Sequence, residues 1–225
     1  MADNVHEEQP VKRSWFTGVV VVLLVASMTF NMYLYSQKLH SNQRERTLAG
    51  ERIILAAWDA QLYTETVLDN IRRLLESSAP GERIAAKQAL GYAFGGSAKG
   101  VHAFISAAQE QEPREGVEMN RSALHFLSQV ELSLRSIGNH GEQLTEPERA
   151  YLTLMEELYV RLLEEISTFD VTNATQQESL LMFVETEWVD MAYAMLSIMN
   201  EPDNLIVEGV DEAEAAVAAE GEPEA

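Results

Sequence analysis

The hydrophobic residues of this chain form one long uninterrupted run, followed by a series of one-sided helical stripes. The run covers residues 15–34, reads WFTGVVVVLLVASMTFNMYL and contains no charged residue. A helix rises about 1.5 Å per residue, so this run spans about 30 Å, the thickness of a bilayer's hydrocarbon core. The run therefore predicts a transmembrane helix over residues 15–35. Its expected anchor residues are large apolar residues of the run and aromatic residues at its ends, namely Trp15, Phe16, Leu23, Leu24, Phe30, Tyr33 and Tyr35.

Two other kinds of segment are also long and apolar. A buried core helix is rarely apolar on every face over such a length. A cleaved signal peptide has an apolar region of about 7–15 residues, followed by a cleavage site of the small-x-small type. Here the run is longer, and Ala26-Ser27-Met28 is a poor cleavage site. We therefore expect an uncleaved single-pass anchor.

The charges that flank the anchor leave its orientation open. Lys12 and Arg13 precede it, but Lys38 and Arg44 follow it, so the count of positive residues on the two sides is ambiguous. A short N-terminal tail, here residues 1–14, most often stays on the cytoplasmic side. We expect a cytoplasmic N-terminus and a helical domain outside the cytoplasm.

Between residues 36 and 200 the apolar residues recur at spacings of three, four and seven, which is typical of amphipathic helices. The anchor is expected to continue into a first helix that ends at the break 77–81. A second helix starts near Pro80, and glycines interrupt it. The first helix is expected to face the core through Leu48, Leu55, Trp58, Leu62, Leu68, Ile71 and Leu75.

Three further helices are expected over about 117–137, 145–169 and 174–200. Thr145 and Glu148 form a capping box that starts the second of these, and Glu201-Pro202 ends the third. No stretch alternates strongly with period two, so no sheet is expected. The predicted fold is all-α: one N-terminal transmembrane helix (15–35), then an antiparallel helical bundle of about five helices (36–200), then an acidic disordered tail (201–225). Within the tail, Leu205–Val207 are expected to pack back on the bundle.

Two groups of residues are candidates for a partner surface: Gly91, Gly95, Gly96 and Gly100 in the second helix, and Met191, Met195 and Met199 in the last. The glycines permit a hinge or a close contact with a partner. They equally permit a kink or a tight crossing within the chain. Methionines that recur every four residues most often form an adaptable core, although a Met-lined groove also binds helices of other proteins.

The charge of the chain narrows the choice of partners. With 36 acidic and 16 basic residues, the formal net charge is −20. Nucleic-acid binding needs clustered Lys and Arg, so that class is excluded. An electrostatic partner should be cationic, either a basic protein surface or a divalent metal. The chain has no cysteine, which excludes disulfides and thiolate metal sites.

The sequence contains no pattern typical of catalysis. The five histidines form no HExxH or similar pair of metal ligands, and no serine stands in a Gly-x-Ser-x-Gly turn. Glu185, Glu187 and Asp190 flank Trp188, but carboxylates hydrolyse glycosides or bind Ca²⁺ only where they converge. We expect them to form a solvated acidic face. The chain is thus predicted to be no enzyme, with no catalytic residue, cofactor or metal ligand.

The last two predicted helices and the residues after them resemble a known family. The first feature is the stretch LTEPERAY at 144–151, which leads into a leucine-rich run. The second is a W-x-D element at Trp188 and Asp190 ahead of an N-x-I-x-x-G element at 204–209. Over residues 15 to about 215, the chain resembles the N-terminal helical half of the spore germination protein YpeB family, without that family's C-terminal half. The resemblance implies a non-enzymatic exported membrane protein that supports a cortex-lytic enzyme in the spore envelope.

Three functional hypotheses follow. The first is a membrane-anchored accessory or scaffold protein whose helical domain binds another envelope protein, such as a cell-wall lytic enzyme, or a further copy in a homo-oligomer. The second is an anchored sensor of a small ligand, which would need a partner to carry its output because only 14 residues precede the anchor. The third is a cell-wall hydrolase that uses Glu185 or Glu187. The lack of a catalytic pattern favours the first.

Overall fold

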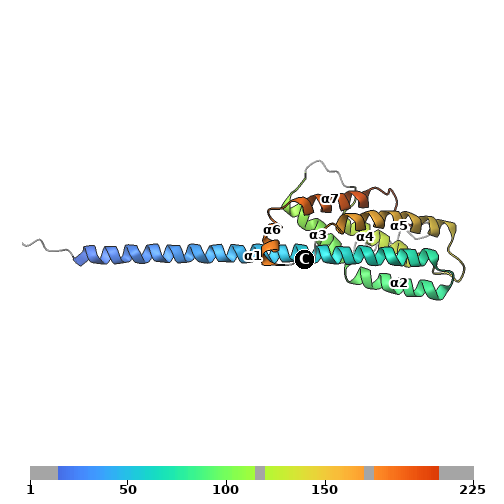
Figure 1. The fold of residues 1–225 in the computed structure, drawn as a ribbon, viewed down its shortest axis with the longest axis horizontal. Helices are drawn as coiled ribbons and strands as arrows, with labels where there is room; N and C mark the ends of the chain where they lie inside the picture. Colours follow the sequence, from blue (N-terminus) through green and yellow to red (C-terminus); the bar gives the residue numbers. More distant parts are fainter. Residues whose placement is uncertain (1–14, 115–119, 170–174, 208–225) are drawn as a thin grey trace, which may run out of the picture. The chain divides into compact units, whose positions relative to one another are not determined.

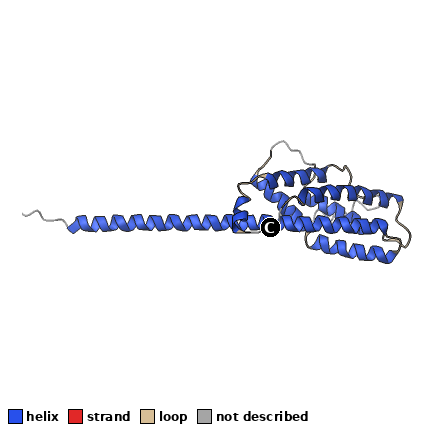
Figure 2. Cartoon of the chain, in the orientation of Figure 1, coloured by secondary structure: helices blue, strands red, loops and turns tan. Residues whose placement is uncertain are grey.

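Helices form all the regular structure in the part of the chain that the computed structural model describes, residues 15–114, 120–169 and 175–207. Figure 2 shows helices and loops, and no strand, in these ranges. The predicted all-α fold is therefore confirmed. The helices are α1 (Trp15–Glu76), α2 (Pro80–Gly95), α3 (Ala98–Gln111), α4 (Ala123–Ser136), α5 (Glu146–Ile166), α6 (Gln176–Leu181) and α7 (Glu187–Asn200).

The chain divides into two compact units, Met1–Glu45 and Arg46–Ala225, and α1 contributes residues to both. In the first unit the described residues are helical and exposed. This part of α1 is long and apolar enough to cross a membrane, by length and composition. All seven predicted anchor residues belong to it, and all seven are exposed.

The second unit is a helical bundle. Helix α7 packs against α3, α4 and α5, while α2 packs against α3 and α4 (Figure 1). The part of α1 in this unit joins the same core. A buried pair connects it to α5, because the hydroxyl oxygens of Tyr63 and Tyr159 lie 3.0 Å apart. The rings of Phe94 and Phe126 flank the two tyrosines.

Two of the predicted helices are each divided in two, so the bundle has more than the five helices expected. The predicted second helix breaks at Gly96, whose backbone (φ −107°, ψ −83°) is not helical. The predicted last helix breaks between Leu181 and Glu187. There the indole N–H of Trp188 donates to the backbone oxygen of Met182 at 2.8 Å. The Trp188 side chain thus donates a hydrogen bond to a backbone carbonyl that has no partner within α6.

The remaining boundaries follow local capping signals. Thr145 and Glu148 form the expected capping box at the start of α5. Helix α4 starts at Ala123, behind Ser122, whose side chain accepts a hydrogen bond from the backbone N–H of His125. The predicted start of this helix near 117 falls among residues 115–119, outside the described ranges.

The buried face of α1 differs from the predicted stripe. The prediction is confirmed at Leu68 and Ile71, but it is wrong in the preceding turns. Four large residues there are exposed, namely Leu48, Leu55, Trp58 and Leu62. The residues that are buried in the same turns include the small residues Gly50, Ala56, Ala57 and Ala60. Small side chains allow the axes of two packed helices to come close together.

Two glycines mark the places where other helices cross α1. A Cβ atom on Gly50 would lie 1.9 Å from the backbone oxygen of Ser179 in α6. A Cβ atom on Gly100 in α3 would lie 2.2 Å from the Cβ of Asp59 and 3.0 Å from the backbone oxygen of Ala56. Both crossings are therefore so close that no side chain fits at either glycine.

The segment 201–207 packs on the bundle, although it was predicted as the start of the tail. Leu205 and Val207 are buried, as expected of this cluster. The Ser133 hydroxyl donates to the backbone oxygen of Leu205 (2.8 Å) and accepts from the backbone N–H of Val207 (3.2 Å). Arg121 donates to the backbone oxygens of Met199 and Pro202. The rest of the predicted tail, 208–225, lies outside the described residues.

The close crossing at Gly100 can be tested on the full-length protein in detergent. Gly100→Ala is expected to lower the free energy of unfolding by about 1–3 kcal/mol, because the added methyl group would collide with α1. The same change at Gly91, which is exposed and has open space around it, should raise that free energy by about 0.5–1 kcal/mol, since alanine is the better helix former. Denaturation followed by circular dichroism measures both. Effects of the same sign would contradict the crossing.

Candidate protein-interaction surface

A row of exposed apolar side chains runs along α1 within the second unit. It consists of Leu48, Leu55, Trp58 and Leu62, each between 43% and 58% exposed. They follow one another at spacings of seven, three and four, so they share one face of the helix over about 21 Å. Contiguous apolar residues on a surface, unlike scattered ones, are typical of an interaction site. We call these four residues the α1 stripe.

Acidic residues border the α1 stripe. By helical spacing, Glu51, Asp59, Glu65 and Asp69 fall on the same side of α1 as the stripe. Two bases, Arg52 and Arg73, fall on that side as well. None of these four carboxylates forms an ion pair within the described ranges. The surface therefore combines exposed apolar side chains with a surplus of negative charge.

The glycines predicted as a partner surface separate into two kinds. Gly91, Gly95 and Gly96 are exposed, and a Cβ atom on any of them would meet no other helix among the described residues within 4 Å. Gly100 is buried in the crossing with α1. The alternative of a tight crossing within the chain therefore applies to Gly100, and this residue is not accessible to a partner.

The predicted methionine surface is wrong for two of its three members. Met195 and Met199 are buried, and only Met191 is partly exposed. The reason is that α7 contacts α3 on one side and α5 on the other, which leaves little of it free. These methionines fill the core, as adaptable thioether side chains commonly do.

The acidic residues around Trp188 lie in two different environments. Glu185 and Glu187 are exposed at the edge of a hollow of about 380 Å³, which Trp188 also lines. Asp190 instead pairs with Arg114. Trp188 itself is buried, with its N–H bonded to a backbone carbonyl. Among the described residues, no three His, Cys, Asp or Glu side chains could together hold a metal ion.

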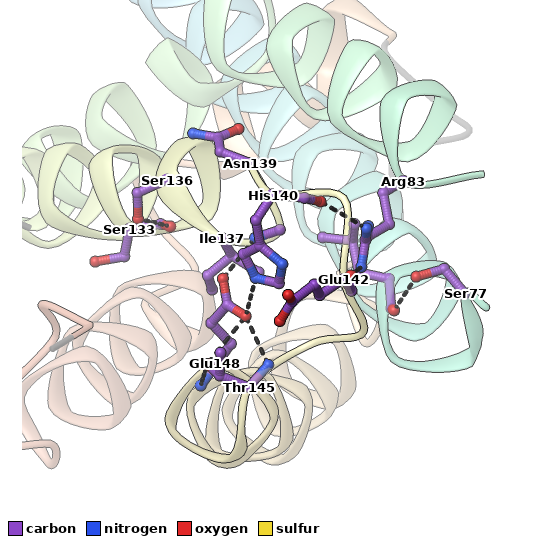
Figure 3. Close-up of polar contacts among 12 residues, drawn as sticks. Ser77, Arg83, Ser133, Ser136, Ile137, Asn139, His140, Glu142, Thr145 and Glu148 are labelled. Carbon is purple, nitrogen blue, oxygen red and sulfur yellow. Dashed lines mark hydrogen bonds and ion pairs between the residues drawn. The ribbon is translucent and has the colours of Figure 1, made fainter. Parts of the chain in front are cut away.

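A polar cluster closes the loop between α4 and α5 (Figure 3). Glu148 accepts hydrogen bonds from the backbone N–H groups of Gly138 (2.6 Å) and Thr145 (2.8 Å). The Thr145 hydroxyl donates to the same carboxylate at 3.0 Å. The imidazole of His140 lies 2.9 Å from it through Nε2. Figure 3 shows His140 and Thr145 directed at the carboxylate of Glu148.

Two basic side chains of α2 hold the same loop. Arg83, which is buried, donates to the backbone oxygens of Glu142 (2.7 Å) and His140 (2.9 Å). Lys87 donates to the backbone oxygen of Ile137 at 2.9 Å, just past the end of α4. Carbonyls at a helix C-terminus lack partners within the helix, and the helix dipole favours a cation there. The cluster, with its His–Glu pair, therefore has a structural role in closing the loop.

The environment of Glu148 favours its ionised form. Burial on its own would raise the pKa of Glu148, but the hydrogen bonds from Gly138, His140 and Thr145 outweigh burial and lower the pKa to about 2. Because the pKa in the folded protein lies below the ordinary value of 4.5, the ionised carboxylate stabilises the fold. This contribution is complete above pH 4.5 and is lost as the pH falls toward 2.

Glu148→Gln is therefore expected to lower the free energy of unfolding at neutral pH by about 3 kcal/mol. The variant should also lose the part of the acid-induced destabilisation that the wild type shows between pH 4.5 and 2. Denaturation curves at a series of pH values measure both effects. Glu157→Gln, at an exposed position of α5, is the control and should follow the wild type. An unchanged pH dependence in Glu148→Gln would contradict the stabilising role of this carboxylate.

Comparison with known proteins found no relative of this chain. No protein-family model, curated protein or solved structure matches the chain. The functional proposal below therefore rests on the residues of this chain.

Proposed function

We propose that the protein is anchored in a membrane by its N-terminal helix, and that its helical domain binds another protein of the cell envelope through the α1 stripe. The observation that carries this proposal is the stripe itself. Large apolar residues face solvent along one side of α1, while small residues of the same turns pack inside. Burial of the exposed part of each large side chain would contribute about 1 kcal/mol to binding.

The anchor is supported by the exposed apolar part of α1. Its residues are apolar on every face, so a soluble environment would leave them all in contact with water. In a bilayer the same residues face hydrocarbon, and the backbone polar groups are paired within the helix. We place the N-terminus in the cytoplasm and the helical domain outside.

The resemblance to the YpeB family extends this proposal to a class of partner. A domain of this kind would position a cell-wall lytic enzyme near the membrane, without catalysing the reaction itself. Within the described residues the cluster around Glu148 serves the fold, and Asp190 is paired with Arg114. Glu185 and Glu187 are exposed at one hollow and belong to no catalytic pattern of the sequence. These observations support an accessory role over a hydrolytic one.

The anchor is tested by charge insertion. Each arginine in the middle of a membrane helix costs about 2.5–3.5 kcal/mol of insertion free energy. The double change Leu23→Arg/Leu24→Arg is therefore expected to move the full-length protein from the membrane to the soluble fraction of lysed cells. Leu39→Arg, which lies beyond the apolar run, should leave it in the membrane. Wild-type protein in the soluble fraction without detergent would contradict the anchor.

The docking surface is tested by cross-linking in the membranes of the organism that makes the protein. Because the chain has no cysteine, Leu55→Cys provides a single attachment point for a photoreactive maleimide. It should yield a conjugate with a second protein, and Trp58→Asp in the same chain should abolish that conjugate. The control is Ile84→Cys on α2, where the side chain is also exposed. If Leu55→Cys gives only monomer, the proposed surface is wrong.

A further inference from the structure

We infer that the α1 stripe receives an amphipathic helix of another protein, and that this helix carries Lys or Arg beside its apolar residues. The inference rests on the proposed function and specifies the chemistry of the partner. Its starting point is the charge around the stripe, where four carboxylates stand against the two bases Arg52 and Arg73. None of the four carboxylates is paired within the described ranges. A partner that buries the stripe must therefore approach negative charge.

The spacing of the stripe suits a helix as its occupant. Leu48, Leu55 and Leu62 recur every seven residues, and Trp58 lies three residues after Leu55. This alternation of three and four is the period at which two helices pack side by side. In this register Glu51 and Glu65 take the same heptad position as Trp58, so a docked helix covers them as well. Covering a carboxylate is costly unless a cation is placed opposite it.

A second copy of the chain does not meet this requirement. Two copies packed in parallel would bring Glu51 against Glu51 and Glu65 against Glu65. Two antiparallel copies, with Leu55 opposite Trp58, would place Glu65 against Leu48. The first arrangement repels, and the second buries a carboxylate against an apolar side chain. An anionic membrane surface is repelled by the same carboxylates.

A basic amphipathic helix meets the requirement on both edges. At 100° per residue, Glu51 and Asp69 fall between the leucines and Trp58. Glu65 lies on the flank beyond Trp58, and Asp59 lies on the flank beyond the leucines. The alkyl stems of Lys and Arg can cover the apolar edge while their charged ends reach these carboxylates. The apolar side chains then provide most of the affinity, and the charged groups select the partner and its direction.

The test uses the full-length protein in phosphatidylcholine nanodiscs and two labelled peptides of about three heptads. Both peptides carry leucine at the seam positions. One has lysine at the flanking positions, and the other has glutamate there. Fluorescence anisotropy should show that the lysine peptide binds at least about tenfold more tightly than the glutamate peptide.

Two variant pairs locate the binding. Leu62→Asp should weaken binding of the lysine peptide about tenfold. Leu154→Asp, at a residue of α5 with the same 43% exposure, should not. Glu51→Gln/Glu65→Gln should weaken binding about fivefold and flatten its salt dependence. Glu157→Gln/Glu164→Gln on α5 is the matched control for charge.

The other outcomes separate this inference from the proposed function. Equal binding of the two peptides, with loss in Leu62→Asp, would overturn the basic partner and leave the docking surface intact. Binding of the lysine peptide that is insensitive to Leu62→Asp, or no binding of either peptide, would overturn both. Disulfide-linked dimers of the Leu55→Cys protein in nanodiscs, absent for Ile84→Cys, would assign the stripe to a second copy and overturn the inference.

Discussion

The architecture of the second unit depends on how closely α3 and α6 approach α1. Gly100 and Gly50 allow the helix backbones to come into contact at the two crossings. The small side chains of Ala56, Ala57 and Ala60 allow the same close approach to this face of α1. The positions at the crossings themselves are taken by small residues, and Ile53, Ile54 and Tyr63 are buried beside them. Leu48, Leu55, Trp58 and Leu62 are left on the outer face. The α1 stripe and the close crossings are therefore two results of one packing constraint.

The surplus of negative charge on the surface follows from how the basic residues are used within the bundle. The chain has few basic residues, and many of them are engaged within the bundle or with its loops. These are Arg72, Arg83, Lys87, Arg114, Arg121, Arg135 and Arg161. Arg83, Lys87 and Arg121 donate hydrogen bonds to backbone carbonyls and form no ion pair with a carboxylate within the described residues. The outer surface is thus left with the surplus of acids, and the surplus of carboxylates beside the α1 stripe is a local instance of it.

Features set by neighbouring residues could be predicted from the sequence, whereas features set by distant residues could not. The uncharged run 15–34 and the capping box at Thr145 are local, and they predicted a helix apolar enough to span a bilayer and the start of α5. The rotation of α1 about its axis depends on contacts with α3 and α6. A signal was present, because at 100° per residue Leu55 and Leu62 lie opposite Ile71. The bond from Trp188 to Met182, which accompanies the break before α7, left no local trace.

The position of Trp58 gives the protein an optical reporter of its own. Half of this residue's surface is in contact with solvent, whereas Trp188 in the same unit is almost fully enclosed. Indole emission moves to shorter wavelength when water is removed from the ring. With Trp15 replaced by phenylalanine, the fluorescence of the chain would come from one indole in the core and one in the α1 stripe. Occupancy of the stripe would then change the spectrum of the second while the first remained a constant internal reference.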